Sequence, residues 1–124
     1  LEPGGKHRCN VWQGDFPNKN SANDGYRWTA PVRAYRKYDN GFYNLVGNVW
    51  EWCADRFHPT WHAKESEATR MNPKGPATGD SRVMKGGSFL CHHSYCNRYR
   101  LGARTANTPD SAATNLGFRC ARDA

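Results

Sequence analysis

The sequence predicts an α+β domain with little regular secondary structure, and three features of its composition support this prediction. Leu, Val and Phe together make up 15 of the 124 residues and Ile is absent, so aliphatic burial alone is a weak source of stability. Sixteen Trp, Tyr and Phe residues argue against a disordered chain. Gly, Pro and Asn number 30, which is typical of a loop-rich fold. We therefore expect aromatic packing, bound metal, disulfides or a further part of the domain to add stability.

The first half of the chain contains one segment with a clear pattern. Residues 1–31 are rich in turn formers, with short extended pieces expected at 10–13 and 31–35. Asp39-Asn40-Gly41 is a hairpin-type turn signal. The run from Val46 to Phe57 alternates apolar and polar side chains, which favours a strand or an irregular buried segment over a helix.

The second half is expected to complete one structural unit. Residues 58–80 are polar, contain three prolines and indicate a surface excursion. Residues 83–90 predict a strand with a bulge or a close backbone approach at Gly86-Gly87. We expect a short helix within 91–104, a loop over 105–114 and a closing strand over 116–121. No internal repeat or interior linker divides the sequence.

The net charge of +7 raises the question of a nucleic-acid partner. The sequence contains twelve Arg and six Lys compared with eleven acidic residues, and its aromatic side chains are suited to stacking on bases. However, no block of Lys and Arg is longer than two residues, so we expect no nucleic-acid partner. No apolar run is long enough for a transmembrane helix, so no membrane partner is expected either. The sequence begins with Leu1 and shows no signal-peptide pattern, and we expect a piece of a longer chain.

Five cysteines leave at least one thiol free or paired outside this chain. No C-x-x-C pair occurs, which argues against a structural zinc site. The segment Cys91-His92-His93-Ser94-Tyr95-Cys96 is the most informative part of the sequence. Its two thiols are compatible with a disulfide that closes a small loop, with a Cu(I) site or with a redox pair. The two histidines are extra ligands or, as we favour, ordinary loop residues.

Three further segments are candidate binding sites, because they contain glycines or oxygen donor atoms. Gly86-Gly87-Ser88 allows a ligand or a second backbone to approach, and the Ser88 hydroxyl could point into the same site as the thiols; a plain bulge is the alternative. A mixture of amide, carboxylate and backbone oxygens suits Ca²⁺, although a turn followed by a buried strand is an equally simple explanation. Such mixtures occur at Asn44, Gly47, Val49 and Glu51 and, less densely, at Asn10, Val11, Asp24 and Tyr26.

Several strings together resemble the C-terminal half of the catalytic domain of the formylglycine-generating enzyme (sulfatase-modifying factor) family. They are NVWQGDFP, TAPV, YNLVGNVWEW, RVMKGGSFL, CHHSYCNRYR and ARTANTPDSAATNLGFRCA, and the resemblance covers essentially all 124 residues. It implies a C-type-lectin-like, loop-rich fold in which residues 1–124 are part of a single domain whose N-terminal half is absent. Relatives that share GNVWEW and NLGFRCA usually lack both cysteines. The pair therefore favours the catalytic enzyme over the alternative, a non-catalytic C-type-lectin-like binding module.

The resemblance implies a specific activity. The family converts a cysteine in a Cys-x-Pro-x-Arg motif of an unfolded sulfatase polypeptide to Cα-formylglycine, using O2 and reducing thiols. Cys91 and Cys96 match its Cu(I) ligands, and Ser88 and Tyr95 match residues that line the same pocket. Further positions near that pocket, expected to bind substrate, match Trp50, Asn115 and Arg119.

The resemblance also implies two structural Ca²⁺ ions and a bacterial cytoplasmic protein. Cys120 matches a cysteine that pairs, in eukaryotic members, with a partner in the absent N-terminal half, whereas Cys9 and Cys53 replace other residues. This pattern favours the cytoplasm over the endoplasmic reticulum lumen or secretion. The expected partners are the sulfatase polypeptide and the N-terminal half of the domain. The matching calcium ligands are Asn10, Val11, Asp24 and Tyr26 for one ion, and Asn44, Gly47, Val49 and Glu51 for the other.

Overall fold

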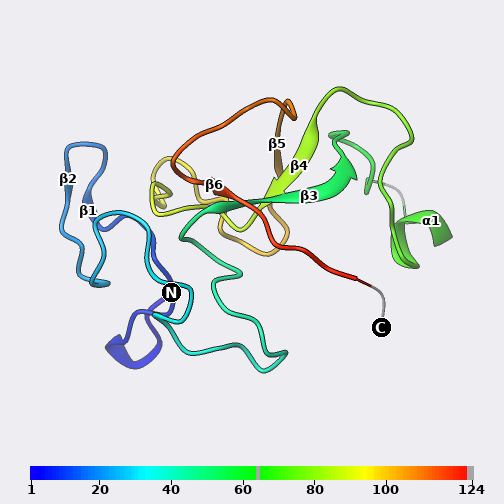
Figure 1. Ribbon diagram of the computed structural model, residues 1–124. Coiled ribbons are helices and arrows are strands. Elements are labelled where there is room, and N and C mark those ends of the chain that lie inside the picture. Colours follow the sequence, from blue (N-terminus) through cyan, green and yellow to red (C-terminus); the bar gives the residue numbers. More distant parts are fainter. Residues whose placement is uncertain (64, 123–124) are drawn as a thin grey trace.

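A four-stranded sheet forms the centre of the computed structural model, which describes residues 1–63 and 65–122 (Figure 1). Its strand order is β5-β4-β3-β6. Strands β5, β4 and β3 pair antiparallel, whereas the last strand pairs parallel to β3. The strands are β3 (Trp50–Arg56), β4 (Arg82–Lys85), β5 (Thr105–Asn107) and β6 (Leu116–Gly117).

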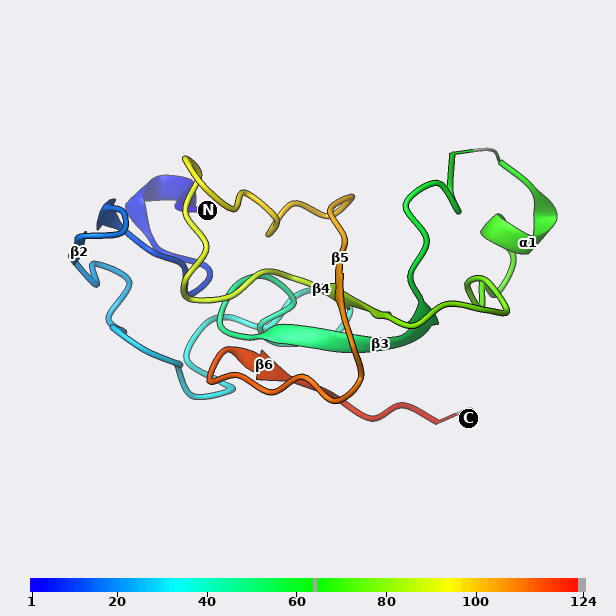
Figure 2. The ribbon, with the colours of Figure 1, turned by 90° about the horizontal axis from the view of Figure 1, so that it is seen from above.

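The remaining regular elements are short and peripheral. A two-stranded antiparallel hairpin joins β1 (Gly14–Asp15) to β2 (Lys19–Asn20). A 3-10 turn spans Pro3–Gly5, and the four-residue helix α1 spans Glu67–Arg70. The hairpin and α1 lie at opposite ends of the molecule in two perpendicular views (Figures 1 and 2). Loops make up most of the described chain, which confirms the predicted loop-rich α+β fold.

The predicted strand in the run from Val46 to Phe57 is confirmed as β3. Trp52 pairs with Met84 of β4, and an irregularity in register follows before Arg56. Trp50 and Met84 are buried together with Cys91 in the main apolar cluster. Trp52 and Tyr99 pack against this cluster, so aromatic side chains supply much of the core, as the composition predicted.

The predicted strand over 83–90 ends early, at Lys85. Gly86 and Gly87 both adopt positive φ, at 89° and 75°, a conformation that breaks strand geometry and favours glycine. The carbonyl of Gly86 accepts a hydrogen bond of 2.8 Å from the Gly47 amide. The close backbone approach expected at the glycine pair is therefore confirmed, and it turns the chain toward residues 88–91.

Asn48 is a buried polar residue whose hydrogen bonds connect separate loops. Its Oδ1 accepts a 2.8 Å hydrogen bond from the Ala30 amide, and its Nδ2 donates to the Ala30 carbonyl at 3.2 Å. The Asn48 amide donates to the Asn10 carbonyl, and the Phe89 amide donates to the Asn48 carbonyl, both at 2.8 Å. Because one residue satisfies backbone groups of three loops, the interior stays ordered without long strand ladders.

Several predicted elements differ from those observed. Residues 32–35 form turns and bends in place of the expected extended piece, whereas 10–13 belong to no strand; the hairpin strands are β1 and β2. The expected loop over 105–114 begins with β5, because its backbone pairs with β4. The closing strand is limited to the two residues of β6. The turn at Asp39-Asn40-Gly41 is confirmed by hydrogen bonds between Tyr38 and both Gly41 and Phe42, although no strands flank it.

The predicted position of the helix was also wrong. Residues 91–104 form successive turns rather than a helix, because the His92 carbonyl alone accepts the amides of Tyr95, Cys96 and Asn97 and the turn is not continued. The α-helix of the described chain instead lies in the surface excursion. The helix begins after Ser66, whose amide donates to the Thr69 hydroxyl at 2.9 Å. This capping interaction is not evident from the polar composition of the segment.

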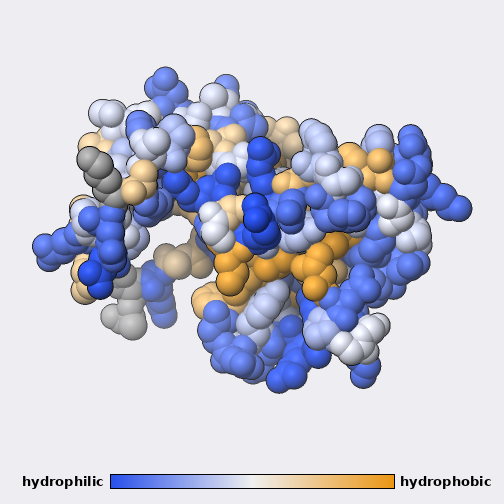
Figure 3. Space-filling model, turned by 180° about the vertical axis from the view of Figure 1, so that it is seen from behind, coloured by the Kyte–Doolittle hydropathy of each residue, from blue (hydrophilic) through white to orange (hydrophobic). Residues whose placement is uncertain are grey.

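Apolar side chains also gather at the surface. Figure 3 shows a band of hydrophobic residues across the middle of one face, with hydrophilic residues on both sides. In the described part of the chain, no helix has the length and hydropathy needed to cross a membrane.

Candidate functional site

The paired-cysteine segment lines a cavity of about 530 Å³ beside the central sheet. Trp50 and Met84 contribute from β3 and β4, and Thr105 begins β5. Six of the seven residues predicted for the catalytic pocket meet in this one cavity: Trp50, Ser88, Cys91, Tyr95, Cys96 and Asn115. The sheet and the loops thus assemble residues that are up to 65 positions apart, from Trp50 to Asn115, in the sequence.

The two thiols lie in one cavity but in different environments. Cys91 is 2% exposed and Cys96 is half-buried, and neither forms a disulfide. Burial raises the pKa of the Cys91 thiol to about 12, and the neighbouring Cys96 thiol adds to this effect. The Ser88 amide donates to the Cys91 sulfur at 3.4 Å, and the Cys91 amide donates to the Ser88 carbonyl at 2.9 Å. A cation at the pair would favour the thiolate that burial disfavours.

Ser88 and Asn115 form a polar edge of the cavity. Ser88 is 1% exposed, and its Oγ accepts hydrogen bonds from Asn115 Nδ2 at 3.1 Å and from the Leu90 amide at 3.3 Å. Both contacts use the oxygen as an acceptor, so the hydroxyl proton stays available to a ligand. The Asn115 carbonyl in turn accepts the Trp50 amide at 2.8 Å, which fixes this edge to the start of β3.

Tyr95 and Arg119 occupy positions outside the buried part of this cavity. Tyr95 lines the cavity but is 77% exposed, so its ring lies at the rim. Arg119 lines a second cavity of about 360 Å³ with Glu51 and Trp52. Its Nε donates to Glu51 Oε2 at 2.6 Å and its Nη2 to Glu51 Oε1. Arg119 therefore does not join the other predicted substrate-binding residues.

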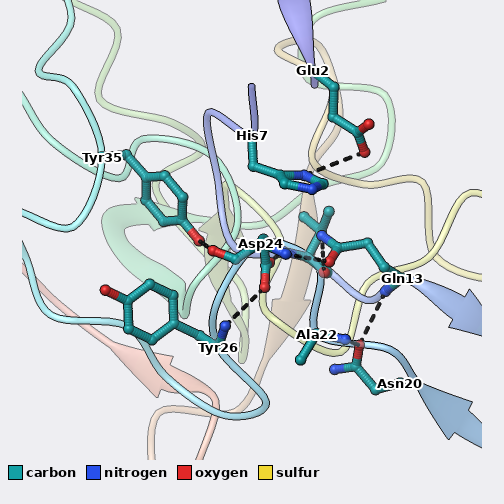
Figure 4. Close-up of polar contacts among 9 residues, drawn as sticks. Glu2, His7, Gln13, Asn20, Ala22, Asp24, Tyr26 and Tyr35 are labelled. Atoms are coloured by element: carbon teal, nitrogen blue, oxygen red, sulfur yellow. Dashed lines mark hydrogen bonds and ion pairs between the residues drawn. The ribbon is translucent and has the colours of Figure 1, made fainter. Parts of the chain in front are cut away.

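The first predicted calcium set surrounds a buried carboxylate. Asp24 is 8% exposed, and its Oδ2 accepts the Val11 amide at 3.1 Å. Its Oδ1 accepts the Tyr26 amide at 3.0 Å (Figure 4). Within residues 1–63 and 65–122, no basic group forms an ion pair with Asp24. Asn10 Oδ1 is buried and accepts no hydrogen bond from the described residues. A buried carboxylate without an ion pair and a buried amide oxygen without a hydrogen-bond donor are both groups that a cation stabilises.

The second predicted calcium set already contains a positive charge. Both oxygens of Glu51 accept hydrogen bonds from Arg119, whose Nη2 also donates to the carbonyls of Tyr43 and Asn44 at 3.1 and 3.4 Å. This pairing with Glu51 raises the pKa of the guanidinium. The Asn44 Nδ2 donates to the Val32 carbonyl at 3.1 Å, which leaves its Oδ1 available. A cation at this set has to share Glu51 with Arg119 or displace it.

The sequence matches, over residues 1–124, the family described as the sulfatase-modifying factor enzyme 1-like domain. The chain belongs to this family. Its relatives include a formylglycine-generating enzyme from Thermomonospora curvata, 63% identical over 123 residues, which are 99% of this chain and 41% of that protein. Another, from Streptomyces coelicolor, is 59% identical over 124 residues, which are 100% of this chain and 38% of that protein. The chain thus spans about two fifths of the length of these relatives.

A solved structure supports the same fold for this sulfatase-modifying factor domain. The structure of PvdO from Pseudomonas aeruginosa superposes with a TM-score of 0.68 at 23% identity and covers 90% of this chain and 37% of that one. The family and the fold expected from the sequence are therefore confirmed. The chain covers only part of each of these proteins, which agrees with a partial domain.

The donor atoms at each candidate site of this sulfatase-modifying factor domain determine which metal ion that site can bind. The described residues contain no group of three or more His, Cys, Asp and Glu side chains close enough to hold a metal. The cavity offers the two thiols Cys91 and Cys96, which fits a soft ion with few ligands such as Cu(I). The Asp24 set offers amide, carboxylate and backbone oxygens, which fits Ca²⁺.

Seven residues of the cavity were missed by sequence reasoning. Phe16 and Pro17 come from the β1–β2 hairpin, and their string GDFP carried only family resemblance and no local signal for a site. Apolar residues that line a pocket have the same pattern as residues that form a core, so spacing alone could not have found them. The missed residues are Trp12, Phe16, Pro17, Met84, Leu90, Arg98 and Thr105.

Proposed function

We propose that this domain forms part of an enzyme that oxidises a cysteine of an unfolded sulfatase polypeptide to Cα-formylglycine, with Cu(I) held by Cys91 and Cys96. The observation that supports this proposal is the meeting of two free thiols, one of them 2% exposed, in a single cavity of about 530 Å³. Relatives that are 63% and 59% identical bear the name formylglycine-generating enzyme. A non-catalytic binding module has no need of such a pair.

The proposed reaction consumes two kinds of thiol, the substrate cysteine and a thiol reductant. Two electrons leave the substrate cysteine as its Cβ reaches the aldehyde level and its sulfur leaves as hydrogen sulfide. Two reductant thiols supply two more electrons and become a disulfide. Together these four electrons and four protons reduce one O2; one of the resulting oxygen atoms is retained, in net terms, as the aldehyde oxygen and the other as water. Cu(I) held by Cys91 and Cys96 would supply a thiophilic, O2-reactive centre.

The residues of the chain are proposed to orient the substrate around the two thiols. The Ser88 hydroxyl, held by Asn115 Nδ2 at 3.1 Å, keeps a proton that it can donate to a polar group beside the sulfur atoms. Trp50 and Met84 give the inner wall an apolar surface that excludes water from the reacting carbon. The exposed ring of Tyr95 offers a stacking surface for the incoming polypeptide at the rim.

Calcium is proposed as a structural ion in this function. Binding at Asp24 and Asn10 neutralises the buried carboxylate and fixes residues 10–12, and the Trp12 amide donates to the Cys91 carbonyl at 3.0 Å. Binding at the second set, which includes Gly47, Val49 and Glu51, requires that Arg119 move or share its acceptors. Both ions would order loops that have few ladder hydrogen bonds, and the N-terminal half of the domain is proposed to cover further apolar surface.

The proposal is tested with the full-length protein loaded with Cu(I). In the presence of O2 and dithiothreitol, we expect it to convert a Cys-x-Pro-x-Arg peptide to the aldehyde, detected by hydrazide capture and a mass change. The Cys96→Ser variant should lose this conversion. The matched control is Cys53→Ser, because Cys53 is a free, half-buried thiol that lines the cavity of Arg119. Undiminished conversion by Cys96→Ser contradicts the assigned role, and loss of conversion in both variants points to a general effect.

A further inference from the structure

One aromatic side chain from the β1–β2 hairpin contacts two side chains of the paired-cysteine segment. The ring of Phe16 stacks on the ring of His92, with centroids 5.9 Å apart and planes inclined by 9°. It also stacks on the ring of Tyr95, with centroids 5.1 Å apart and planes inclined by 17°. A residue outside the segment therefore contacts the second and the fifth of its six residues, between the two cysteines.

The backbone of this segment is a single turn organised by one acceptor. The carbonyl of His92 accepts the amides of Tyr95, Cys96 and Asn97 at 3.1, 2.9 and 3.1 Å. This turn sets how far Cys96 lies from Cys91. Because an isolated turn has no neighbouring turns to support it, its stability depends on contacts made from outside.

Trp12 and the hairpin supply those contacts at two points. Trp12 precedes the hairpin; its amide donates to the Cys91 carbonyl at 3.0 Å, and its ring meets the Phe16 ring edge-on with centroids 5.2 Å apart. Phe16 then contacts the far side of the turn through Tyr95. Trp12 and Phe16 therefore hold the turn near the first cysteine and near the second.

We infer that Phe16 is a positioning residue that holds the Cys91–Cys96 turn closed, so that both thiols face the same cavity. Phe16 lines that cavity but carries no group that can bind a metal or move a proton, so it acts through His92 and Tyr95. The link to Cu(I) rests on the proposed function, whereas the closure of the turn does not. Aromatic pairs of this geometry contribute beyond the area that they bury, and Leu cannot replace them.

The closure of the turn is measured by the alkylation rate of single cysteines in the full-length, copper-free protein. Cys91 is 2% exposed, so its reaction with iodoacetamide is slow while the turn is closed and accelerates when the turn opens. We expect the labelling rate of Cys91 to rise about tenfold in Phe16→Leu, from the loss of two aromatic contacts. Phe16→Tyr keeps the ring and should label at the wild-type rate.

Two controls separate a positioning role from a general loss of stability. Cys9 is 3% exposed and lies outside the turn, so its labelling rate should stay unchanged in Phe16→Leu. Phe57→Leu removes another half-buried Phe, which lies under the Arg104 guanidinium at 5.5 Å, and should leave Cys91 labelling unchanged. Equal acceleration at Cys9 and Cys91, or no acceleration at Cys91, would overturn the inference.

Cu(I) affinity, measured by competition with a chromophoric chelator, distinguishes this inference from the proposed function. We expect the dissociation constant to rise about tenfold in Phe16→Leu and to stay at the wild-type value in Phe16→Tyr. A wild-type protein that binds no Cu(I) contradicts the proposed function, while the alkylation rates still decide the role of Phe16. A wild-type protein that binds Cu(I) with the same affinity as Phe16→Leu contradicts the link between Phe16 and the metal site.

Discussion

Arg119 and Glu51 form a two-point ion pair between the C-terminal strand region and β3. Arg119 Nε donates to Glu51 Oε2 at 2.6 Å, and its Nη2 donates to the other carboxylate oxygen and to two loop carbonyls. The guanidinium therefore binds the Glu51 carboxylate oxygens, which the sequence predicted as calcium ligands. Arginine is suited to this position because its planar group donates to several acceptors at once.

Removal of this guanidinium should tighten calcium binding at the second set. In the full-length protein, we expect Arg119→Gln to bind Ca²⁺ there about fivefold more tightly, because a partly exposed ion pair has a modest net free energy. Calorimetric Ca²⁺ titration measures the change. Arg122→Gln is the control, because the exposed Arg122 forms no ion pair in the described part of the chain. An unchanged affinity in Arg119→Gln would show that Arg119 and Ca²⁺ do not compete.

Calcium at the first set should account for most of the stabilisation that this ion gives. A chelator should lower the melting temperature of the full-length protein by several degrees, since a ligand that binds only the folded state stabilises it. Asp24→Asn should abolish most of this difference, because the buried carboxylate is the charged ligand of the set. Asp39→Asn changes a fully exposed carboxylate and should retain the difference. Equal chelator effects in the wild type and Asp24→Asn would contradict the first calcium site.

The sequence predicted the parts of this molecule that depend on local pattern or on whole motifs. Alternation favoured a strand at β3, and Gly86-Gly87 predicted a bulge or a close backbone approach, because both follow from conformational preferences of nearby residues. The end of β4 at Lys85 was not predicted. The motif CHHSYC predicted that the two thiols share a site, because they are only five positions apart in the sequence.

The other features of the fold and of the site depend on tertiary contacts that no local sequence pattern encodes. β5 forms because Ala106 meets Val83 across the sheet, and nothing in its own three residues indicates a strand. Phe16 lies 75 positions before Cys91 in the sequence, and only the tertiary packing of the hairpin brings its ring to the cysteine turn. Arg119 was expected beside the thiols but lies at a separate cavity, because Glu51 holds it there.

Burial of Cys9 should make the folded state less stable at high pH. Desolvation raises the pKa of this thiol from 9.0 to about 11. The folded state therefore holds the proton more tightly than the unfolded state, so stabilisation is complete below about pH 9 and is lost as the pH rises from about 9 to about 11. We expect up to about 3 kcal/mol of the free energy of unfolding to disappear over this range.

Urea denaturation of the full-length protein at a series of pH values measures this loss. Cys9→Ala should show a shallower decline than the wild type, because its side chain has no proton to lose. Cys120→Ala changes an exposed thiol and should follow the wild-type curve. Identical slopes in the wild type and Cys9→Ala would mean that Cys9 does not titrate differently in the two states.

Gly47 should tolerate no side chain, for a steric reason that adds to its backbone conformation. It has a φ of +72°, and a Cβ there would lie 2.2 Å from the Asn10 carbonyl oxygen and 3.1 Å from Val11 Cγ1. Gly41 has a similar φ of +86°, but nothing lies within 4 Å of the position of its Cβ. Comparison of the two alanine variants therefore separates the clash from the cost of positive φ.

We expect Gly41→Ala to lower the free energy of unfolding by about 1 kcal/mol, the cost of the left-handed conformation for alanine. Gly47→Ala should lower it by about 3 kcal/mol or more, because Asn10 must move and the hydrogen bond from the Asn48 amide to its carbonyl is lost. Because Asn10 belongs to the proposed first calcium set, its displacement in Gly47→Ala should also weaken Ca²⁺ binding at that set, whereas Gly41→Ala should not. Urea denaturation and Ca²⁺ titration of both full-length variants test this coupling, and equal effects in the two would show that the contact between Gly47 and Asn10 is not tight.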